Sequence, residues 1–314
     1  MDRKEDNETS WPEEFILTEL TDHKVLNLIL FVLFLFTYLA AVFGNLLIIV
    51  LVRTDPCLHT PMYFFLSNLS ILEVCSASTT VPQILFHFLS EKRAMPQICC
   101  ALQLFFFLTF VIAEIFVLTV MSYDRYVAIC FPLHYSQQVT KQVCILMAAA
   151  CWMGGLFLSA INTAFTLKLS FGGHNKIDHF LCEMPAMVRS AYGGTYNVKM
   201  CLYISCVFTL ISPLLLILVS YARILYTILG NHCNTCKHKA ISTCSSHLLV
   251  VILFFGSGIS AYLGPHSSSS KEHLKMASVF YIVITPALNP IIYSLRNKEV
   301  MQAFKKVRNK GTIN

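Results

Sequence analysis

The sequence predicts an all-α membrane protein, a seven-transmembrane helix bundle followed by a short amphipathic eighth helix. Composition is the first observation: 56% of the 314 residues are hydrophobic and 13% are charged, whereas soluble domains carry about 25% charged residues. The second observation is seven long apolar segments, each with the ~20 residues that a helix needs to cross a bilayer. The third is a basic, amphipathic segment after the last of them.

The seven apolar segments account for most of the chain and predict one transmembrane domain over residues 25–295. The acidic side chains inside them are Glu73 and Glu114. An acidic residue within a membrane is costly and usually functional. The segments cover residues 25–52, 60–89, 98–123, 142–167, 200–222, 240–263 and 276–295.

The two ends of the chain are predicted to lie on opposite sides of the membrane, because the number of spans is odd. Residues 1–24 are polar and acidic, without the basic start and short apolar core of a cleavable signal peptide. Lys and Arg are shared almost equally between the two sides, so charge alone does not orient the chain. The basic tail and a glycosylation acceptor at Asn7 favour an extracellular amino terminus, in a multi-pass protein of the plasma membrane.

The carboxyl-terminal segment, residues 296–314, begins with RNKEVMQAFKKV. Its apolar residues recur at helical spacing with lysines opposite them, which predicts a short amphipathic helix on the cytoplasmic membrane surface. The apolar stripe consists of Val300, Met301, Phe304 and Val307.

Six short motifs stand in order along the apolar segments. Together they resemble the olfactory receptors, class II type, a family of rhodopsin-like G-protein-coupled receptors, and the resemblance covers essentially the whole chain. It implies a receptor without enzymatic activity that binds small, mostly apolar volatile molecules. It also implies activation of a heterotrimeric G protein of the stimulatory olfactory type, which raises cyclic AMP. The motifs are Gly44-Asn45, HTPMYFFLSNLS (59–70), MSYDRYVAICFPLHY (121–135), Ser220-Tyr221, KAISTCSSH (239–247) and TPALNPIIYSLRN (285–297).

The resemblance implies an activation switch near the cytoplasmic ends of the helices. Arg125 is expected to pair with Asp124 in the closed bundle and to meet the G protein in the open one. Pro290 lacks a backbone donor, so it is expected to break its helix and free a carbonyl for Asn45 or water. The simpler alternatives are an interfacial anchor at Arg125 and a mere kink at Pro290. The switch comprises Asp124, Arg125, Tyr126, Tyr221, Asn289, Pro290 and Tyr293.

The intramembrane acids suggest an ion site. Glu73 and Glu114 each lie mid-span and should face the bundle interior. With Asn45 and Asn289 they could hold a sodium ion, and the alternative is two protonated, hydrogen-bonded acids without an ion. Related receptors usually carry Asp at the position of Glu73, so the extra methylene changes the geometry of such a site.

The resemblance also implies a disulfide between Cys100 and Cys182, with Cys99 as the rival partner. Olfactory receptors typically form a second bridge within the same loop, and Gly172 and Tyr192 occupy the matching positions here. The loop is therefore expected to be more mobile than in its relatives.

Two cysteine–histidine clusters invite a metal interpretation, but no metal site is predicted. In the stretch from His179 to Cys182 the thiol is expected to be in the disulfide, which removes it as a ligand. The other cluster has zinc-like spacing, and a reduced polar loop is the favoured interpretation. Its members are His232, Cys233, Cys236 and His238.

The expected ligand site lies on the outer halves of the third, fifth, sixth and seventh spans, where inward positions recur at helical spacing. Phe107 stands where amine receptors place an acid, so the predicted pocket carries no charge. Ser205, Thr209 and Tyr262 could bond to an alcohol, aldehyde, ketone or ester. Phe255 replaces a tyrosine that is common in the family. The predicted set is Leu104, Phe107, Leu108, Val111, Ile112, Ser205, Cys206, Thr209, Phe255, Gly258, Ile259, Tyr262, Val279 and Ile282.

Other functional classes fit less well. An ion transporter could use Glu73 and Glu114, but the sequence has no internal repeat and no chain of acids. A membrane hydrolase would need clustered His and Asp at one depth, and no such cluster is found. No basic block suggests nucleic acid as a partner.

Overall fold

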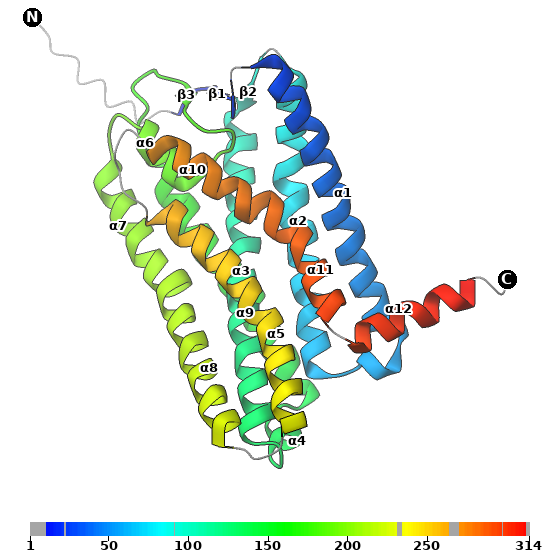
Figure 1. The fold of residues 1–314 in the computed structure, drawn as a ribbon. Coiled ribbons are helices and arrows are strands. Elements are labelled where there is room, and N and C mark those ends of the chain that lie inside the picture. Colours follow the sequence, from blue (N-terminus) through cyan, green and yellow to red (C-terminus); the bar gives the residue numbers. More distant parts are fainter. Residues whose placement is uncertain are drawn as a thin grey trace, which may run out of the picture.

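The computed structural model describes residues 11–21, 23–90, 92–230, 234–263, 270–296 and 298–311. Within these ranges, seven helices are long and apolar enough to cross a membrane. They form an elongated bundle with a small sheet at one end, here called the sheet end (Figure 1). The glycosylation acceptor at Asn7 lies outside the described residues.

The first four spans are single helices. Pro61 opens the second at the position where a missing backbone N–H costs nothing. Thr140 caps the fourth by accepting a hydrogen bond from the backbone N–H of Val143 at 3.3 Å. Three of these helices match the apolar segments to within two residues at each end, whereas the third span runs seven residues past the end of its segment, because a helix end outside the hydrocarbon can be polar. The four helices are α1 (Lys24–Thr54), α2 (Pro61–Leu89), α3 (Gln97–Cys130) and α5 (Lys141–Thr166).

Among the last three spans, the fifth and the seventh each contain a π-helical segment, and the sixth is a single helix. Each π segment ends shortly before a proline, Pro213 in the fifth span and Pro286 in the seventh. A proline cannot donate to the helix and its ring pushes on the preceding turn, and a π turn can absorb that mismatch. The elements are α7 (Thr195–Cys206), η2 (Val207–Ile211) and α8 (Ser212–Gly230), then α9 (Asn234–Tyr262), then α10 (Ser270–Val279), η3 (Phe280–Ile284) and α11 (Thr285–Arg296).

The predicted break at Pro290 is wrong, because α11 continues through this residue. The seventh span departs from α geometry further upstream, in η3. The carbonyl that Pro290 cannot engage is that of Pro286, four residues earlier. It accepts a hydrogen bond from the side-chain amide of Asn45 at 3.2 Å. The freed carbonyl therefore finds the partner expected for it, and the helix does not break.

The eighth helix, α12 (Lys298–Gly311), turns away from the bundle axis at the end opposite the sheet (Figure 1). Glu299 accepts a hydrogen bond from the hydroxyl of Tyr63 at 2.6 Å. The predicted apolar stripe divides in two: Val300 is buried, whereas Met301 and Phe304 are exposed. The side chain of Val307 lies outside the described residues. The exposed part of the stripe is available for contact with lipid.

The connections contribute short elements. Asp55 forms an ion pair with Lys306 at 3.1 Å, which fixes α12 beside the connection between α1 and α2. The remaining short helices are η1 (Pro56–Leu58) and α4 (Tyr135–Gln138) at the end opposite the sheet, and α6 (Met184–Ser190), which follows Cys182.

A three-stranded sheet, absent from the sequence-based prediction, closes the sheet end of the bundle. Phe15 and Leu17 alternate with exposed neighbours and are buried, which is the period of a half-buried strand. The central strand pairs antiparallel with one neighbour and parallel with the other. The strands are β1 (Glu14–Leu17), β2 (Ala94–Pro96) and β3 (Lys176–Ile177), in the order β2-β1-β3.

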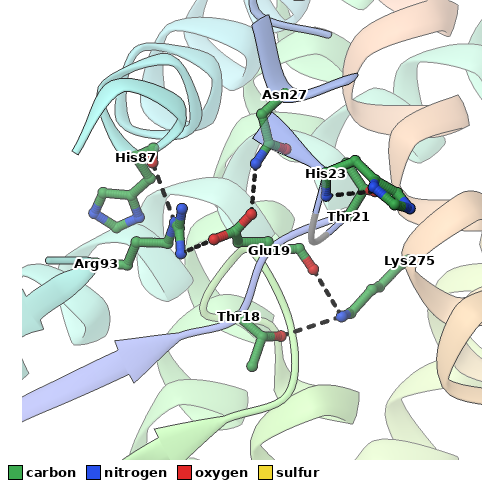
Figure 2. Close-up of polar contacts among 8 residues, drawn as sticks. All are labelled: Thr18, Glu19, Thr21, His23, Asn27, His87, Arg93 and Lys275. Atoms are coloured by element: carbon green, nitrogen blue, oxygen red, sulfur yellow. Dashed lines mark hydrogen bonds and ion pairs between the residues drawn. The ribbon is translucent and has the colours of Figure 1, made fainter. Parts of the chain in front are cut away.

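Polar contacts tie the amino-terminal segment to three parts of the bundle (Figure 2). Glu19 forms an ion pair with Arg93 and accepts a hydrogen bond from the amide of Asn27 on α1 at 2.5 Å. Lys275 on α10 donates to the hydroxyl of Thr18 at 3.1 Å and to the carbonyl of Glu19 at 2.9 Å. The segment after β1 therefore bridges α1, the connection before β2, and the seventh span.

Candidate ligand cavity and switch region

A cavity of about 40 Å³ lies in the half of the bundle nearer the sheet, between α3, α7 and α9. A water molecule needs roughly 10–15 Å³, so the cavity has room for a few waters. Its walls are almost wholly apolar, with a few hydroxyl and amide groups. The lining residues are Leu108, Val111, Ile112, Ile115, Asn162, Met184, Leu202, Ser205, Cys206, Thr209, Leu210, Phe254, Gly258, Tyr262 and Tyr281.

The structure brings part of the predicted ligand-binding set to this cavity. Those that line it are Leu108, Val111, Ile112, Ser205, Cys206, Thr209, Gly258 and Tyr262. Those that do not line it are Leu104, Phe107, Phe255, Ile259, Val279 and Ile282. Among the second group, Phe255 is buried in the core, and its neighbour Phe254 faces the cavity instead.

Helical spacing missed several lining residues for identifiable reasons. Tyr281 belongs to the π-helical segment η3, where the added residue shifts the register that an α-helical pattern assumes. Asn162 lies on α5 and Met184 on α6, which the pattern did not consider. The sequence does mark these residues as polar or flexible side chains in or beside an apolar span. Such side chains are equally common in ordinary helix packing, so they did not indicate a cavity.

The polar groups on the α5 and α7 side of the cavity bond to each other. Both amide hydrogens of Asn162 are used, by the carbonyl of Leu158 at 2.9 Å and the hydroxyl oxygen of Ser205 at 2.8 Å. The hydroxyl of Thr209 donates to the carbonyl of Ser205 at 2.9 Å. The donors of Asn162 and Thr209 are therefore already committed.

The polar groups on the opposite side are held by the connection that carries α6. The hydroxyl of Tyr281 donates to Glu183 Oε2 at 2.7 Å, and Ser278 donates to the same oxygen at 3.3 Å. Burial raises the pKa of Glu183 to about 7. The hydroxyl of Tyr262 is buried and has no hydrogen-bond partner among the described residues. The sequence-based prediction of a charge-free pocket did not include the carboxyl group of Glu183.

A disulfide holds this connection over the cavity. Cys182 is bonded to Cys100 at the start of α3, with their Cα atoms 5.5 Å apart, and Cys99 is free and exposed. Gly172 and Tyr192 lie against each other, because a Cβ at Gly172 would be 3.4 Å from the Cβ of Tyr192. The positions of the second bridge found in related receptors therefore remain neighbours here.

The histidine beside this disulfide is buried and neutral. Its Nδ1 accepts from the backbone N–H of Leu181 at 3.2 Å, and burial lowers the pKa of His179 to about 3. In the described part of the chain, no group of three or more metal-ligating residues is found. Residues 232 and 233 and the side chains of Cys236 and His238 lie outside it.

The candidate ion-site residues are buried in the middle of the bundle. Asn289 donates to one oxygen of Glu73. Four oxygens have no hydrogen-bond partner among the described residues: Glu73 Oε2, Glu114 Oε1, Asn45 Oδ1 and Asn289 Oδ1. Carboxylate and amide oxygens are ligands that hard cations prefer, so these residues fit a bound cation.

The first span packs closely against this region through Gly44. A Cβ at this position would lie 2.8 Å from the Cβ of Pro290. Only glycine fits this contact without displacing a neighbour. The Gly44-Asn45 motif and the Asn289-Pro290 motif are therefore two halves of one packed contact between α1 and α11.

The predicted ion pair between Asp124 and Arg125 does not form in the described residues. Asp124 instead accepts a hydrogen bond from the hydroxyl of Tyr135 at 2.7 Å. Adjacent residues on a helix point in different directions, so they are poorly placed to pair. Arg125 interacts electrostatically with Tyr221 and Tyr293. The ring of Tyr126, the next residue along α3, packs edge-on against Phe131.

His247 connects three helices in the same region, a role that the sequence did not reveal. Its Nε2 lies 3.1 Å from the carbonyl of Leu118 on α3, and its Nδ1 lies 2.8 Å from the hydroxyl of Tyr221 on α8. A carbonyl can only accept, so Nε2 carries the proton and Nδ1 accepts from Tyr221. The available signal was a histidine at the end of motif 239–247, directly before the apolar run that follows it.

The fold is the seven-helix bundle of the rhodopsin type. The structure matches squid rhodopsin with a TM-score of 0.74 at 16% identity, covering 95% of this chain and 91% of that chain. At this identity the match shows the fold alone.

Sequence comparisons give the family. The family model for olfactory receptors matches residues 34–310. The chain is 47% identical over 294 residues to Olfactory receptor 2D2 of Homo sapiens, covering 94% of this chain and 95% of that protein. It is 45% identical over 297 residues to Olfactory receptor 2C1 of Mus musculus, covering 95% of each. The chain belongs to the olfactory receptor family, so it is a multi-pass membrane receptor of the G-protein-coupled class rather than an enzyme.

Proposed function

We propose that this protein binds small, mostly apolar volatile molecules in the cavity between α3, α7 and α9. The apolar lining of that cavity, with hydroxyl groups at its margin, carries the proposal. Binding pockets for whole small molecules measure about 300–1,000 Å³, so an odorant must enlarge the space seen here. Met184 has an unbranched, adaptable side chain, so its movement would supply part of that room, and the helices around the cavity would supply the rest.

The binding of an odorant is proposed to activate a stimulatory olfactory G protein and raise cyclic AMP. An expanded cavity pushes on α8 and α9, and the hydrogen bonds of His247 join these helices to α3. Separation of the helices would break those bonds and expose Arg125 to the G protein. Family membership supports G-protein coupling in general, and the stimulatory type is part of the proposal.

The orientation proposed is the sheet end outside and α12 in the cytoplasm. The extracellular segment would then comprise residues 1–24, the transmembrane domain 25–295, and the cytoplasmic helix and tail 296–314. Asn7 would carry a glycan. Epitope tags at the two ends test this, because only the amino-terminal tag should be stained on cells that have not been permeabilised.

A sodium ion is proposed to bind among the unpartnered oxygens of Glu73, Glu114, Asn45 and Asn289 and to neutralise the acids. Purified receptor should melt at a higher temperature in sodium chloride than in potassium chloride. Glu73→Gln and Glu114→Gln should each remove that difference and change basal signalling. Unchanged sodium sensitivity and basal signalling in both variants would show that the acids are simply protonated.

A cyclic AMP reporter tests the main proposal. Cells that make the receptor should respond to members of a varied odorant panel, and Arg125→Ala should abolish the response at equal surface expression. Replacement of the stimulatory G protein by an inhibitory one should remove the rise in cyclic AMP. The proposal would be contradicted if the receptor reaches the cell surface but gives no response to any odorant with either G protein.

A further inference from the structure

The cavity has one polar end whose two hydroxyl groups play different roles. Tyr262 comes from the end of α9 and Tyr281 from η3, and their ring centroids are 6.5 Å apart. Both line the cavity. Glu183 stands behind Tyr281, on the connection that the disulfide fixes to α3. An inference from this arrangement rests on the proposed function, because it concerns which ligands the same cavity selects.

Tyr281 can offer the cavity only an acceptor. Its hydroxyl hydrogen is engaged by Glu183 Oε2 at 2.7 Å. The hydroxyl of Ser278 lies 3.4 Å from the oxygen of Tyr281 but donates to the same carboxyl oxygen of Glu183, so the lone pairs of Tyr281 remain. Oε2 of Glu183 accepts this hydrogen whether or not the carboxyl group is ionised, because a proton on the carboxyl group can occupy Oε1, which has no partner among the described residues. When the carboxyl group is ionised, the hydrogen bond is stronger than one between neutral groups. It also polarises the donating hydroxyl, which makes the oxygen of Tyr281 a better acceptor. Glu183 is itself almost fully buried, so water does not compete for this bond.

Tyr262 offers the cavity a donor. Its hydroxyl is buried and has no hydrogen-bond partner within 3.5 Å in the described part of the chain, and its longer interaction with the hydroxyl of Tyr281 is the one that a ligand would replace. A buried hydroxyl in this state carries an unfavourable free energy that a ligand acceptor would relieve. On the other polar side of the cavity, Asn162 and Thr209 have already committed their donors, and the hydroxyl oxygen of Ser205 accepts from Asn162.

We propose that Tyr262 and Tyr281 form a donor–acceptor pair that selects ligands carrying a hydroxyl group, with Glu183 as the positioning residue that keeps Tyr281 an acceptor. A ligand hydroxyl accepts from Tyr262 and donates to Tyr281. An ether, ketone or aldehyde has acceptors only, so it satisfies Tyr262 and leaves Tyr281 without a partner. The favoured ligands are small volatile alcohols and phenols.

A purely structural role for the same contacts makes a different prediction. These contacts join Glu183 to Ser278 and Tyr281. If they only hold the loop against the seventh span, their loss lowers the potency of all ligands equally. If they select a hydroxyl group, their loss changes the ratio between an alcohol and its methyl ether. The ratio therefore separates the two roles, and damage to folding or surface expression does not alter it.

The experiment uses pairs of volatile molecules that share a carbon skeleton, each an alcohol and its methyl ether, with the matching aldehyde as a third member. Cyclic AMP dose–response curves are measured for wild type, Tyr281→Phe, Tyr262→Phe and Glu183→Leu at matched surface expression. The control is Tyr38→Phe, which removes a tyrosine hydroxyl that contacts Ser78, between α1 and α2 and away from the cavity.

Wild type should respond to the alcohol at about tenfold lower concentration than to the ether, the ratio expected for one additional hydrogen bond. Tyr281→Phe and Glu183→Leu should bring the ratio close to one through a loss of alcohol potency, because leucine has no acceptor for the hydroxyl hydrogen of Tyr281. Tyr262→Phe should weaken alcohols, ethers and aldehydes alike, and Tyr38→Phe should preserve the wild-type ratio. Equal potency of alcohols and ethers on wild type, or an unchanged ratio in Tyr281→Phe, would overturn the proposal.

A second measurement separates this inference from the proposed signalling function. Thermal melting of the purified receptor with each alcohol–ether pair reads binding without a G protein. If no odorant raises cyclic AMP but alcohols alone raise the melting temperature of wild type, and not of Tyr281→Phe, the selectivity holds and the proposed signalling fails. Equal melting shifts for alcohols and ethers, including no shift, overturn the selectivity.

Discussion

The side-chain amide of Asn45 donates a hydrogen bond, 3.2 Å long, to the carbonyl of Pro286, the group that Pro290 leaves without its helical partner. The same amide donates to the carbonyl of Ala41 in its own helix at 3.0 Å. One residue of the first span thus completes the hydrogen bonding of the seventh. In a hydrocarbon environment, an unpaired carbonyl has no water to turn to.

Replacement of Asn45 tests this contact. Asn45→Leu should lower the stability of the purified receptor by about 1–3 kcal/mol, the cost of a buried polar group left unpaired. Thermal melting in detergent is the measurement. Thr37→Val on the same helix is the control, because its hydroxyl bonds only to carbonyls of α1 and is partly exposed. Equal melting temperatures for the two variants would contradict the account.

Gly44 should tolerate no side chain. Gly44→Ala places a Cβ 2.8 Å from that of Pro290 and should lower stability by about 1–3 kcal/mol through overpacking. Gly256→Ala is the matched control, because nothing lies within 4 Å of its added Cβ. There, alanine should stabilise the helix by up to about 1 kcal/mol. A Gly44→Ala receptor that melts no lower than the control would show that α1 and α11 are not tightly packed.

A second disulfide can be restored in the loop. In Gly172→Cys with Tyr192→Cys, the new thiols would extend from Cβ atoms 3.4 Å apart, close to the spacing of natural bridges. Gly172 has a φ of 57°, which costs a cysteine about 1–3 kcal/mol. Closing a loop of about 20 residues contributes about 3 kcal/mol.

The double variant should therefore be slightly more stable than wild type, and its loop should exchange amide hydrogens more slowly. Gly172→Cys alone carries the strain without the bridge and should be the least stable. If mass spectrometry shows the bridge but loop exchange is unchanged, the loop was already ordered, and its expected mobility is wrong.

The pH dependence of stability should reflect two buried groups of opposite sign. The pKa of His179 is lowered to about 3 from an ordinary 6.5, so its contribution is present above pH 6.5 and is lost as the pH falls toward 3. The pKa of Glu183 is raised to about 7 from 4.5, so its contribution is present at low pH and is lost as the pH rises from 4.5 through 7. Between pH 4.5 and 6.5 the two effects oppose each other.

Single variants should separate these effects. Glu183→Gln should leave a melting temperature that falls as the pH drops below 6.5, whereas His179→Asn should leave one that falls as the pH rises from 4.5 to 7. In each variant, the free energy of unfolding should change by up to about 1.4 kcal/mol per pH unit, the value for one proton. Identical pH profiles in both variants and wild type would contradict the burial of these side chains.

The apolar spans and their order could be predicted from the sequence, because each long apolar run has only one stable form in a bilayer. The cavity residues of α3, Leu108, Val111 and Ile112, were also predictable because that helix is regular. The sheet was not predicted, because a strand of four residues pairs with loops distant in sequence. Its signal, the buried alternation of Phe15 and Leu17, is too short to distinguish from a loop.

The polar end of the cavity could not be predicted from the sequence. Tyr281 faces the cavity through a π-helical turn, and Glu183 reaches it from a connection whose path depends on the disulfide of Cys182. The missing pair of Asp124 and Arg125 has a simpler cause. The two residues are adjacent in sequence, and adjacent positions on a helix do not face each other.

Odorants are proposed to act by occupying the cavity between α3, α7 and α9. A comparison of two glycines on α9 tests it most directly. Gly258 lines the cavity, where an added Cβ would meet Leu210 at 3.5 Å, whereas a Cβ at Gly256 would meet nothing within 4 Å. Cyclic AMP dose–response curves for Gly258→Leu and Gly256→Leu, at matched surface expression, are the measurement.

We expect Gly258→Leu to fill the cavity and lower odorant potency by about tenfold or more, the equivalent of about 1.4 kcal/mol, and Gly256→Leu to respond as wild type does. Unchanged potency in Gly258→Leu, for every odorant that activates wild type, would show that the ligand binds elsewhere.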